Sequence, residues 1–101
     1  MNDSIQIIKL SSGQELIAKI VERADGVTVV SHPMTVQPVR EGNQMKISLM
    51  PFLWGAASGE AMPINDYHVV CMTKANPDLR NEFAGAIGDV VIATPRITLA
   101  E

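Results

Sequence analysis

The sequence predicts a mainly β fold, a small and strongly bent antiparallel barrel of five strands with one C-terminal helix. Several short segments alternate apolar and polar residues with a period of two, as half-buried strands do. Glycine-containing turn sequences separate these segments, and Asp25 with Gly26 is the clearest of them. A later segment changes to the helical period directly after Asn76 and Pro77.

Length and composition indicate a single domain. The chain has 101 residues, of which 47% are hydrophobic, and this is enough for a packed core. We place the barrel at about residues 4–74, the helix at about 77–87 and a tail at 89–101. A domain of this size gains stability when copies of it assemble symmetrically.

The first two predicted strands are joined by a tight turn. The β-branched segment Ile5–Leu10 forms the first strand, the Ser-Ser-Gly sequence at 11–13 forms the turn, and residues 15–23 form the second strand. Apolar side chains occupy both faces of the second strand: Leu16, Ala18 and Ile20 on one, Ile17 and Val21 on the other. We therefore expect this strand to be covered on both sides at one end.

Two prolines interrupt the predicted third strand. After the Asp-Gly turn, residues 27–30 resume the extended pattern. Pro33 cannot donate a backbone hydrogen bond, so we expect a bulge, a bend or a sheet edge near His32 and Pro33. Residues 34–39 continue extended, and Pro38 again indicates an edge or an end.

The last two strands lie on either side of a loop. A Glu-Gly-Asn turn at 41–43 leads into residues 44–50, which alternate cleanly. A loop rich in small residues follows at 51–61. The fifth strand lies within residues 62–74 and is centred on 67–72.

The helix is predicted from its cap and its apolar stripe. Asn76 suits the N-cap and Pro77 suits the first helical position. Gly88 suits the end of the helix. The apolar residues of the segment recur at intervals of four: Leu79, Phe83 and Ile87. This spacing places them on one face, which we expect to pack against the barrel.

Residue content indicates no enzyme, no metal centre and no cofactor. The single cysteine, Cys71, lies in an apolar segment and can form neither an intrachain disulfide nor a cysteine metal cluster. His32 and His68 are the only histidines, and no carboxylate pair has the spacing for acid–base chemistry. The formal net charge of -3 is unlike that of a typical nucleic-acid binder, although local basic patches matter more than the sum.

Sequence features of targeting indicate a cytoplasmic protein. The opening MNDSIQIIKL has no basic segment before an apolar one, so we expect no signal peptide. The apolar runs are too short to span a bilayer, so we expect no membrane partner.

The first hairpin resembles the first sequence motif of the Sm/LSm family, which includes the bacterial Hfq proteins. In this motif, a strand ending in Leu-x-x-Gly precedes small or apolar residues at alternate positions, as residues 10–20 do here. The chain most closely resembles phage-type Sm-like proteins, with which it shares a Leu-Met-Pro segment at 49–51 and an Asn-Pro-capped helix. That likeness covers about residues 4–88. The chain departs from the family in three ways. Its helix follows the strands, and Thr28 stands at about the place where the family has an asparagine that contacts bases. The second motif, an apolar residue followed by Arg or Lys and Gly, is absent.

The resemblance implies a homo-oligomeric ring in which strand four of one subunit pairs with strand five of the next. It further implies binding of single-stranded nucleic acid, with RNA favoured over DNA, and a role in RNA or DNA processing. On this reading Arg23 and Lys46 contact phosphate, Thr28 bonds a base or sugar, and Trp54 stacks on a base. Each has a plainer alternative: the cations are salt-bridged at the surface, and Trp54 caps the barrel or packs into a neighbouring subunit.

A second hypothesis is a structural or protein-interaction ring of phage origin that binds no nucleic acid. Such a ring would act in the host cytoplasm during infection. The placement of charge discriminates between the two hypotheses. Basic residues that are dispersed and paired with Glu or Asp favour the protein-interaction ring, whereas basic residues that line one face or a pore favour nucleic acid.

Overall fold

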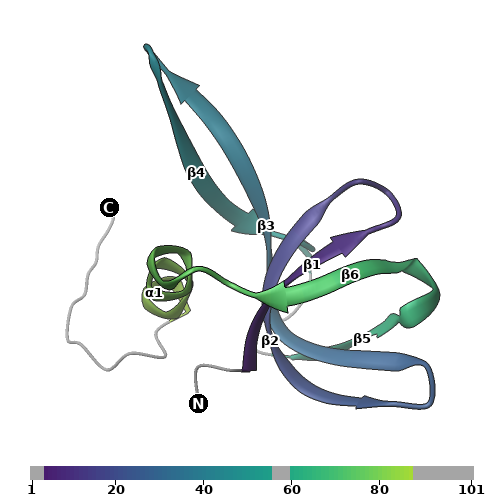
Figure 1. The fold of residues 1–101 in the computed structure, drawn as a ribbon. Coiled ribbons are helices and arrows are strands. Elements are labelled where there is room, and N and C mark those ends of the chain that lie inside the picture. The colour runs from purple at the N-terminus through teal and green to yellow at the C-terminus, as the bar shows by residue number, and fades with distance from the viewer. Residues whose placement is uncertain (1–3, 56–59, 88–101) are drawn as a thin grey trace.

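A computed structural model describes residues 4–55 and 60–87, which form one antiparallel sheet of six strands with one C-terminal helix (Figure 1). The elements in chain order are β1 (Ile5–Leu10), β2 (Glu15–Ala24), β3 (Val27–Glu41), β4 (Gln44–Pro51), β5 (Ala61–Asn65), a 3₁₀ turn η2 (Asp66–His68), β6 (Val69–Lys74) and α1 (Pro77–Ala86). The mainly β class and the single helix are as predicted.

The sheet has six strands rather than the predicted five, because the fifth is divided in two. The strand order is β4-β3-β2-β1-β6, and β5 pairs with β3 beside this path. Between β5 and β6 the side chain of Asn65 accepts a 2.9 Å hydrogen bond from the backbone N–H of Tyr67 and caps the turn. The chain therefore leaves β3 at Asn65 and reaches β1 four residues later, at Val69.

The predicted Asp-Gly hairpin between β2 and β3 is confirmed. Asp25 has φ 55° and Gly26 has φ 79°. Positive φ at both central residues is the geometry that matches the right-handed twist of the two strands. Asp and Gly are among the few residues that adopt it at low cost.

The predicted bulge in β3 is also confirmed. Ile17 lies opposite Met34 and Lys19 lies opposite Ser31, so the single residue Ala18 faces both His32 and Pro33. His32 has φ 54°, a left-handed conformation that is rare for residues other than glycine. The bulge accommodates the missing N–H of Pro33.

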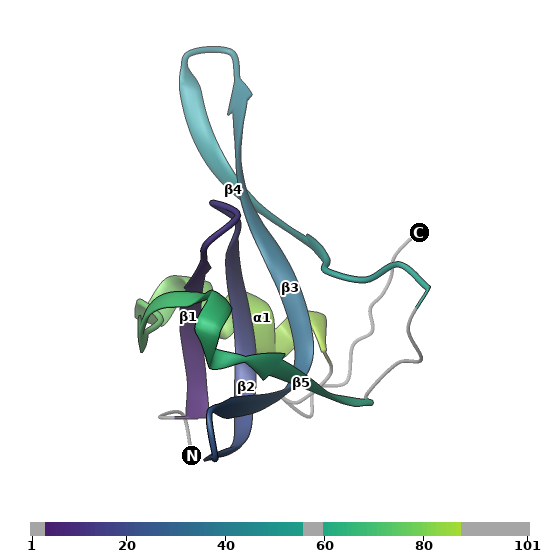
Figure 2. The ribbon, with the colours of Figure 1, turned by 90° about the vertical axis from the view of Figure 1, so that its right-hand side faces the viewer.

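The end of β3 forms an arm with β4. The pairing of β2 with β3 stops at Thr35, whereas β4 pairs with β3 as far as Glu41. We call residues 36–49 the arm; it projects beyond the other strands (Figures 1 and 2). Pro38 lies in this part of β3, where β4 is the only described strand that pairs with β3. The sheet edge predicted at this proline is therefore confirmed.

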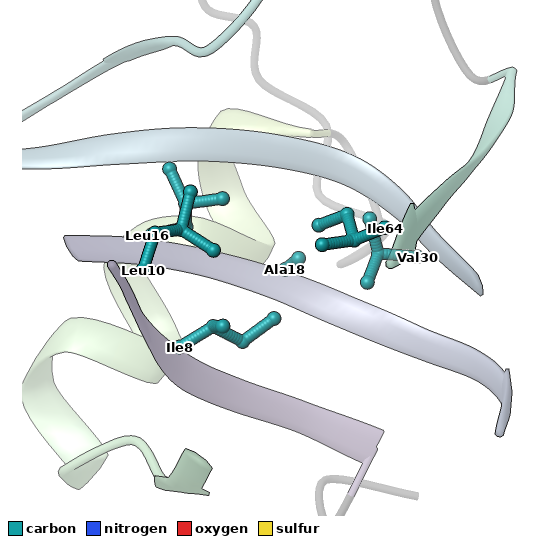
Figure 3. Packing of buried hydrophobic residues seen from close by; sticks show 6 residues of the cluster. All are labelled: Ile8, Leu10, Leu16, Ala18, Val30 and Ile64. Atoms are coloured by element: carbon teal, nitrogen blue, oxygen red, sulfur yellow. The ribbon is translucent and has the colours of Figure 1, made fainter. Parts of the chain in front are cut away.

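Two apolar clusters cover the two faces of β2. One, shown in Figure 3, is formed by Ile8, Leu10, Leu16, Ala18, Val30 and Ile64. The other is formed by Ile5, Ile17, Val36, Ala75 and Phe83. The consecutive residues Leu16, Ile17 and Ala18 are all fully buried, so β2 is covered on both sides as predicted.

Helix α1 covers the second cluster. The side chain of Asn76 accepts a 2.8 Å hydrogen bond from the N–H of Leu79, and Pro77 occupies the first turn. Phe83 is fully buried, and Leu79 and Ile87 pack against the same cluster, so the predicted stripe is confirmed. The predicted stop at Gly88 and the tail at 89–101 lie outside the described residues.

The sheet is open at two edges. Strands β4 and β6 stand at the two ends of the pairing order, and among the described strands each has a single partner. Within residues 4–55 and 60–87, no helix has the length and hydropathy needed to cross a membrane.

Candidate functional site

A polar network joins the β2–β3 hairpin to the turn before β6. The hydroxyl of Thr28 donates a 2.6 Å hydrogen bond to Oδ1 of Asp66. The Nε of Arg23 donates to the hydroxyl of Thr28 at 3.2 Å, and its Nη2 lies 3.7 Å from Oδ2 of Asp66. The backbone N–H of Asp66 also donates to the carbonyl of Gly26 at 2.8 Å. Side-chain and backbone bonds together fix the turn against the hairpin.

Register explains why Arg23 and Thr28 meet. They are cross-strand partners in the pairing of β2 with β3, so their side chains project from the same face. Both are site residues predicted from the sequence, and the structure brings them together. Asp66, which joins them, was not among the predicted site residues.

Thr28 is enclosed by this network. It is fully buried, and its hydroxyl bonds two protein groups. A hydrogen bond from Thr28 to a base or sugar would therefore require the network to open. In the structure described, Thr28 positions Arg23 and Asp66.

Arg23 and Tyr67 are the accessible groups at this end of the sheet. The Arg23 side chain is 54% exposed, although Asp66 offsets its charge. Tyr67 is 86% exposed and follows Asp66 on the fixed turn, with its ring edge-on to His68. An exposed aromatic ring can stack on a planar ligand, and the residue before it, Asp66, is paired with the Arg23 guanidinium. Tyr67 was not among the predicted site residues, because it was expected inside a strand. The Asn65-Asp66 pair before it is a turn signal that predicts its exposure.

Lys46 lies on the arm, apart from Arg23. Its Nζ is 3.1 Å from Oε1 of Glu41 in an exposed ion pair. Arg23 pairs with Thr28 and Lys46 pairs with Val39, so 11 positions of β3 (39 minus 28) separate the two sites. At a rise of about 3.3 Å per residue this is roughly 36 Å along the strand. One copy of the chain therefore does not place the two cations in a single patch.

Trp54 is 73% exposed just after β4. Phe52, in contrast, is partly buried and packs against the first cluster. Its backbone N–H donates to the carbonyl of Pro33 at 3.2 Å. Leu53 is exposed as well. The indole is thus available to a ligand or a neighbouring subunit, and both alternatives remain predictions.

Exposed apolar side chains are found on both edge strands. On the arm, Pro38–Ile47 and Arg40–Met45 are cross-strand pairs on the same face as the pair of buried Val36 with partly buried Leu49. Ile47 and Met45 therefore extend an apolar face outward from the second cluster, and both are exposed. On β6, Val70 and Cys71 are exposed.

Comparison with known proteins identifies no relative. No family model matches the chain, and no curated protein matches it. The likeness to Sm proteins therefore stays a prediction.

Proposed function

We propose that this protein is a self-assembling ring subunit in which β4 of one copy pairs with β6 of the next. The observation that carries the proposal is the open sheet, in which β4 and β6, at the two ends of the pairing order, each have one described partner. Unpaired N–H and C=O groups on such strands are templates for another strand. Repeated head-to-tail pairing gives a ring when the rotation per copy closes.

The Sm-like barrel belongs to the same proposal. Strands β5 and β4 pair with successive parts of β3, at 27–31 and 34–41. They therefore occupy the place of one strand along β3, although β4 ends at Pro51 and β5 begins at Ala61. With the bulge at His32 bending β3, this arrangement supports a small, strongly bent sheet of the Sm kind.

The placement of charge favours the protein-interaction ring over the nucleic-acid ring. Arg23 faces Asp66 and Lys46 faces Glu41, so both predicted phosphate contacts are paired with a carboxylate. The two pairs are also far apart along β3. The edge strands, in contrast, expose apolar side chains, which assembly would remove from water.

Light scattering coupled to gel filtration tests the proposal. We expect the intact chain to elute with the mass of several copies at micromolar concentration. Val70→Lys and Ile47→Lys each place a charge on one edge strand and should yield monomer. Val21→Lys adds the same charge to an exposed position of β2 and should leave the mass unchanged. An intact chain that is monomeric would refute the ring.

A second candidate function is the binding of single-stranded RNA or DNA. It is favoured by the half-exposed Arg23, which is paired with Asp66, and by the exposed Tyr67, which follows Asp66 in the chain. A ring would repeat this pair once per subunit, so that weak contacts add along one strand. Short oligonucleotides should bind at about 50 mM salt and dissociate as the salt concentration rises. No binding at low salt would exclude this function and leave assembly alone.

A further inference from the structure

A groove runs between β4 and α1. It consists of two adjoining hollows of about 660 and 630 Å³ that share Lys46, Ile47 and Glu82. The groove is lined by Lys46, Ile47, Leu49, Leu79, Glu82 and Ala86, among others. It extends from the first turn of α1 to its last.

The groove runs along β4, whose outer edge has no described partner strand. Four consecutive residues, 46–49, line it together with Val39 and Glu41 of β3, and consecutive residues of a strand point to opposite faces. A hollow that touches all four residues of β4 therefore reaches the backbone of the strand. An extended segment lying there could pair with β4 and bury Ile47, which is exposed.

The chain itself supplies a segment of suitable length and composition. Gly85 and Ala86, at the end of α1, line the groove. Fourteen residues, 88–101, follow Ile87, and they include the apolar run Val-Val-Ile-Ala at 90–93. Three residues of extended chain span about 10 Å, so a chain leaving Ile87 is long enough to bring this run to the groove. Pro95 cannot continue a strand ladder and limits the run to a few residues.

We propose that residues 90–93 bind in the groove of their own chain as a strand added to β4. The apolar run covers Ile47 and Leu49, and its backbone pairs with the free edge. Charge agrees with this placement. Glu41, Asp78 and Glu82 line the groove against the single cation Lys46, and Arg96 follows the run.

Proximity favours the chain's own segment over a second copy. A short flexible connection gives an effective concentration on the order of millimolar, well above a micromolar protein solution. If the ring of the proposed function forms, the segment competes with β6 of the neighbour for β4. This regulatory consequence rests on the proposed function, whereas the docking itself does not.

Cysteine cross-linking tests the docking. In the full chain with Cys71→Ser, Ile47→Cys and Val91→Cys should form a disulfide on mild oxidation, because paired strands bring Cβ atoms within disulfide range. A mixture of ¹⁴N- and ¹⁵N-labelled protein distinguishes its origin by mass spectrometry. Intrachain bonds join only peptides of the same label. The control pair, Val21→Cys with Val91→Cys, should not cross-link.

Each outcome decides the proposal. An intrachain bond in the test pair, absent from the control, supports it even if the chain is monomeric at every concentration, in which case the ring alone fails. Mixed-label bonds between chains, or no bond at any concentration, overturn it. A ring without the intrachain bond shows that the docking fails while the ring stands.

Hydrogen exchange gives a second test that needs no cysteine. We expect Val91→Asp in the full chain to raise the exchange rates of the outward-facing amides of β4 at least tenfold, because the charged side chain disfavours the groove. The exchange rates of the β2 amides should be the same in the two proteins. Equal β4 rates in the two proteins, measured where both are monomeric, would overturn the docking.

Discussion

Thr28 and Asp66, 38 positions apart in the chain, are joined by a 2.6 Å hydrogen bond from a buried hydroxyl to a carboxylate oxygen. This bond connects the hairpin between β2 and β3 to the turn between β5 and β6. It therefore determines where the chain leaves β3 and crosses to β1, and it sets the position of Arg23 and Tyr67.

We predict that Thr28→Val destabilises the protein by about 1–3 kcal/mol. The substitution keeps the shape of the side chain but removes a hydrogen bond to a charged group. Thr28→Ser retains the hydroxyl and should cost less. Thr35→Val is the matched control, since Thr35 is also buried on β3 and no hydrogen bond of its hydroxyl to a carboxylate is found among the described residues. Urea denaturation followed by circular dichroism gives the free energies, and equal losses for Thr28→Val and Thr35→Val would contradict the role of Asp66.

The bulge at His32 makes a second prediction. His32 has φ 54°, and its Nδ1 is buried without a hydrogen-bond partner in the part of the chain that the structure describes. A left-handed conformation costs roughly 1–2 kcal/mol for most residues and very little for glycine. We expect His32→Gly to preserve or raise the melting temperature and His32→Val to lower it. Gln37→Val, at an exposed residue of β3 with no positive φ, is the control. A His32→Val protein as stable as the wild type would argue against the bulge.

The features predicted well from sequence depend on neighbouring residues. The Asp25–Gly26 turn, the bulge at Pro33 and the Asn76 cap each follow from the conformational limits of one or two residues. The period of two also located the faces of β2, because Leu16 and Ile17 are both buried. Such local signals are visible in a single sequence.

The features that were missed depend on contacts between distant segments. The predicted fifth strand is divided because Asp66 forms hydrogen bonds with Thr28 and Gly26. These contacts join distant segments, so they cannot be predicted from residues 62–74 alone. For the candidate site, register placed Arg23 beside Thr28, but the separation of Lys46 depends on where β2 stops pairing with β3. Tyr67 was assigned to a strand and its exposure was therefore not predicted.

The helix cap gives a third prediction. Asn76 accepts the N–H of Leu79 at 2.8 Å, and loss of such a cap costs about 0.5–2 kcal/mol. Because α1 covers the second cluster, the helix should unfold with the sheet rather than separately. We expect Asn76→Ala to lower the midpoint of urea denaturation without changing the dependence of the unfolding free energy on urea concentration. Asn81→Ala, at an exposed helical position, should not lower the midpoint. Equal effects of the two substitutions would show that the cap contributes nothing.

The last prediction concerns nucleic-acid binding and separates its ionic and stacking parts. If Arg23 contacts phosphate, Arg23→Ala should weaken oligonucleotide binding evenly across sequences and reduce the salt slope by about 0.7 for single strands. Tyr67→Ala should cost about 1–3 kcal/mol per stacked base and leave the salt slope nearly unchanged, whereas Tyr67→Phe should retain affinity. Trp54→Ala makes the same comparison at the other exposed aromatic. Fluorescence anisotropy at two salt concentrations measures both quantities.

Controls for this prediction come from the network and the arm. Arg23 also bonds Thr28, so each variant must first be shown by circular dichroism to fold as the wild type does. Lys46→Ala removes an equal charge about 36 Å away along β3. If the bound single-stranded nucleic acid contacts only the Arg23 end of the molecule, Lys46→Ala leaves the salt dependence of its affinity unchanged. If it also follows the arm, both substitutions lower the slope. A slope that neither substitution changes means that neither cation neutralises phosphate, and the nucleic-acid reading of both residues would then be wrong.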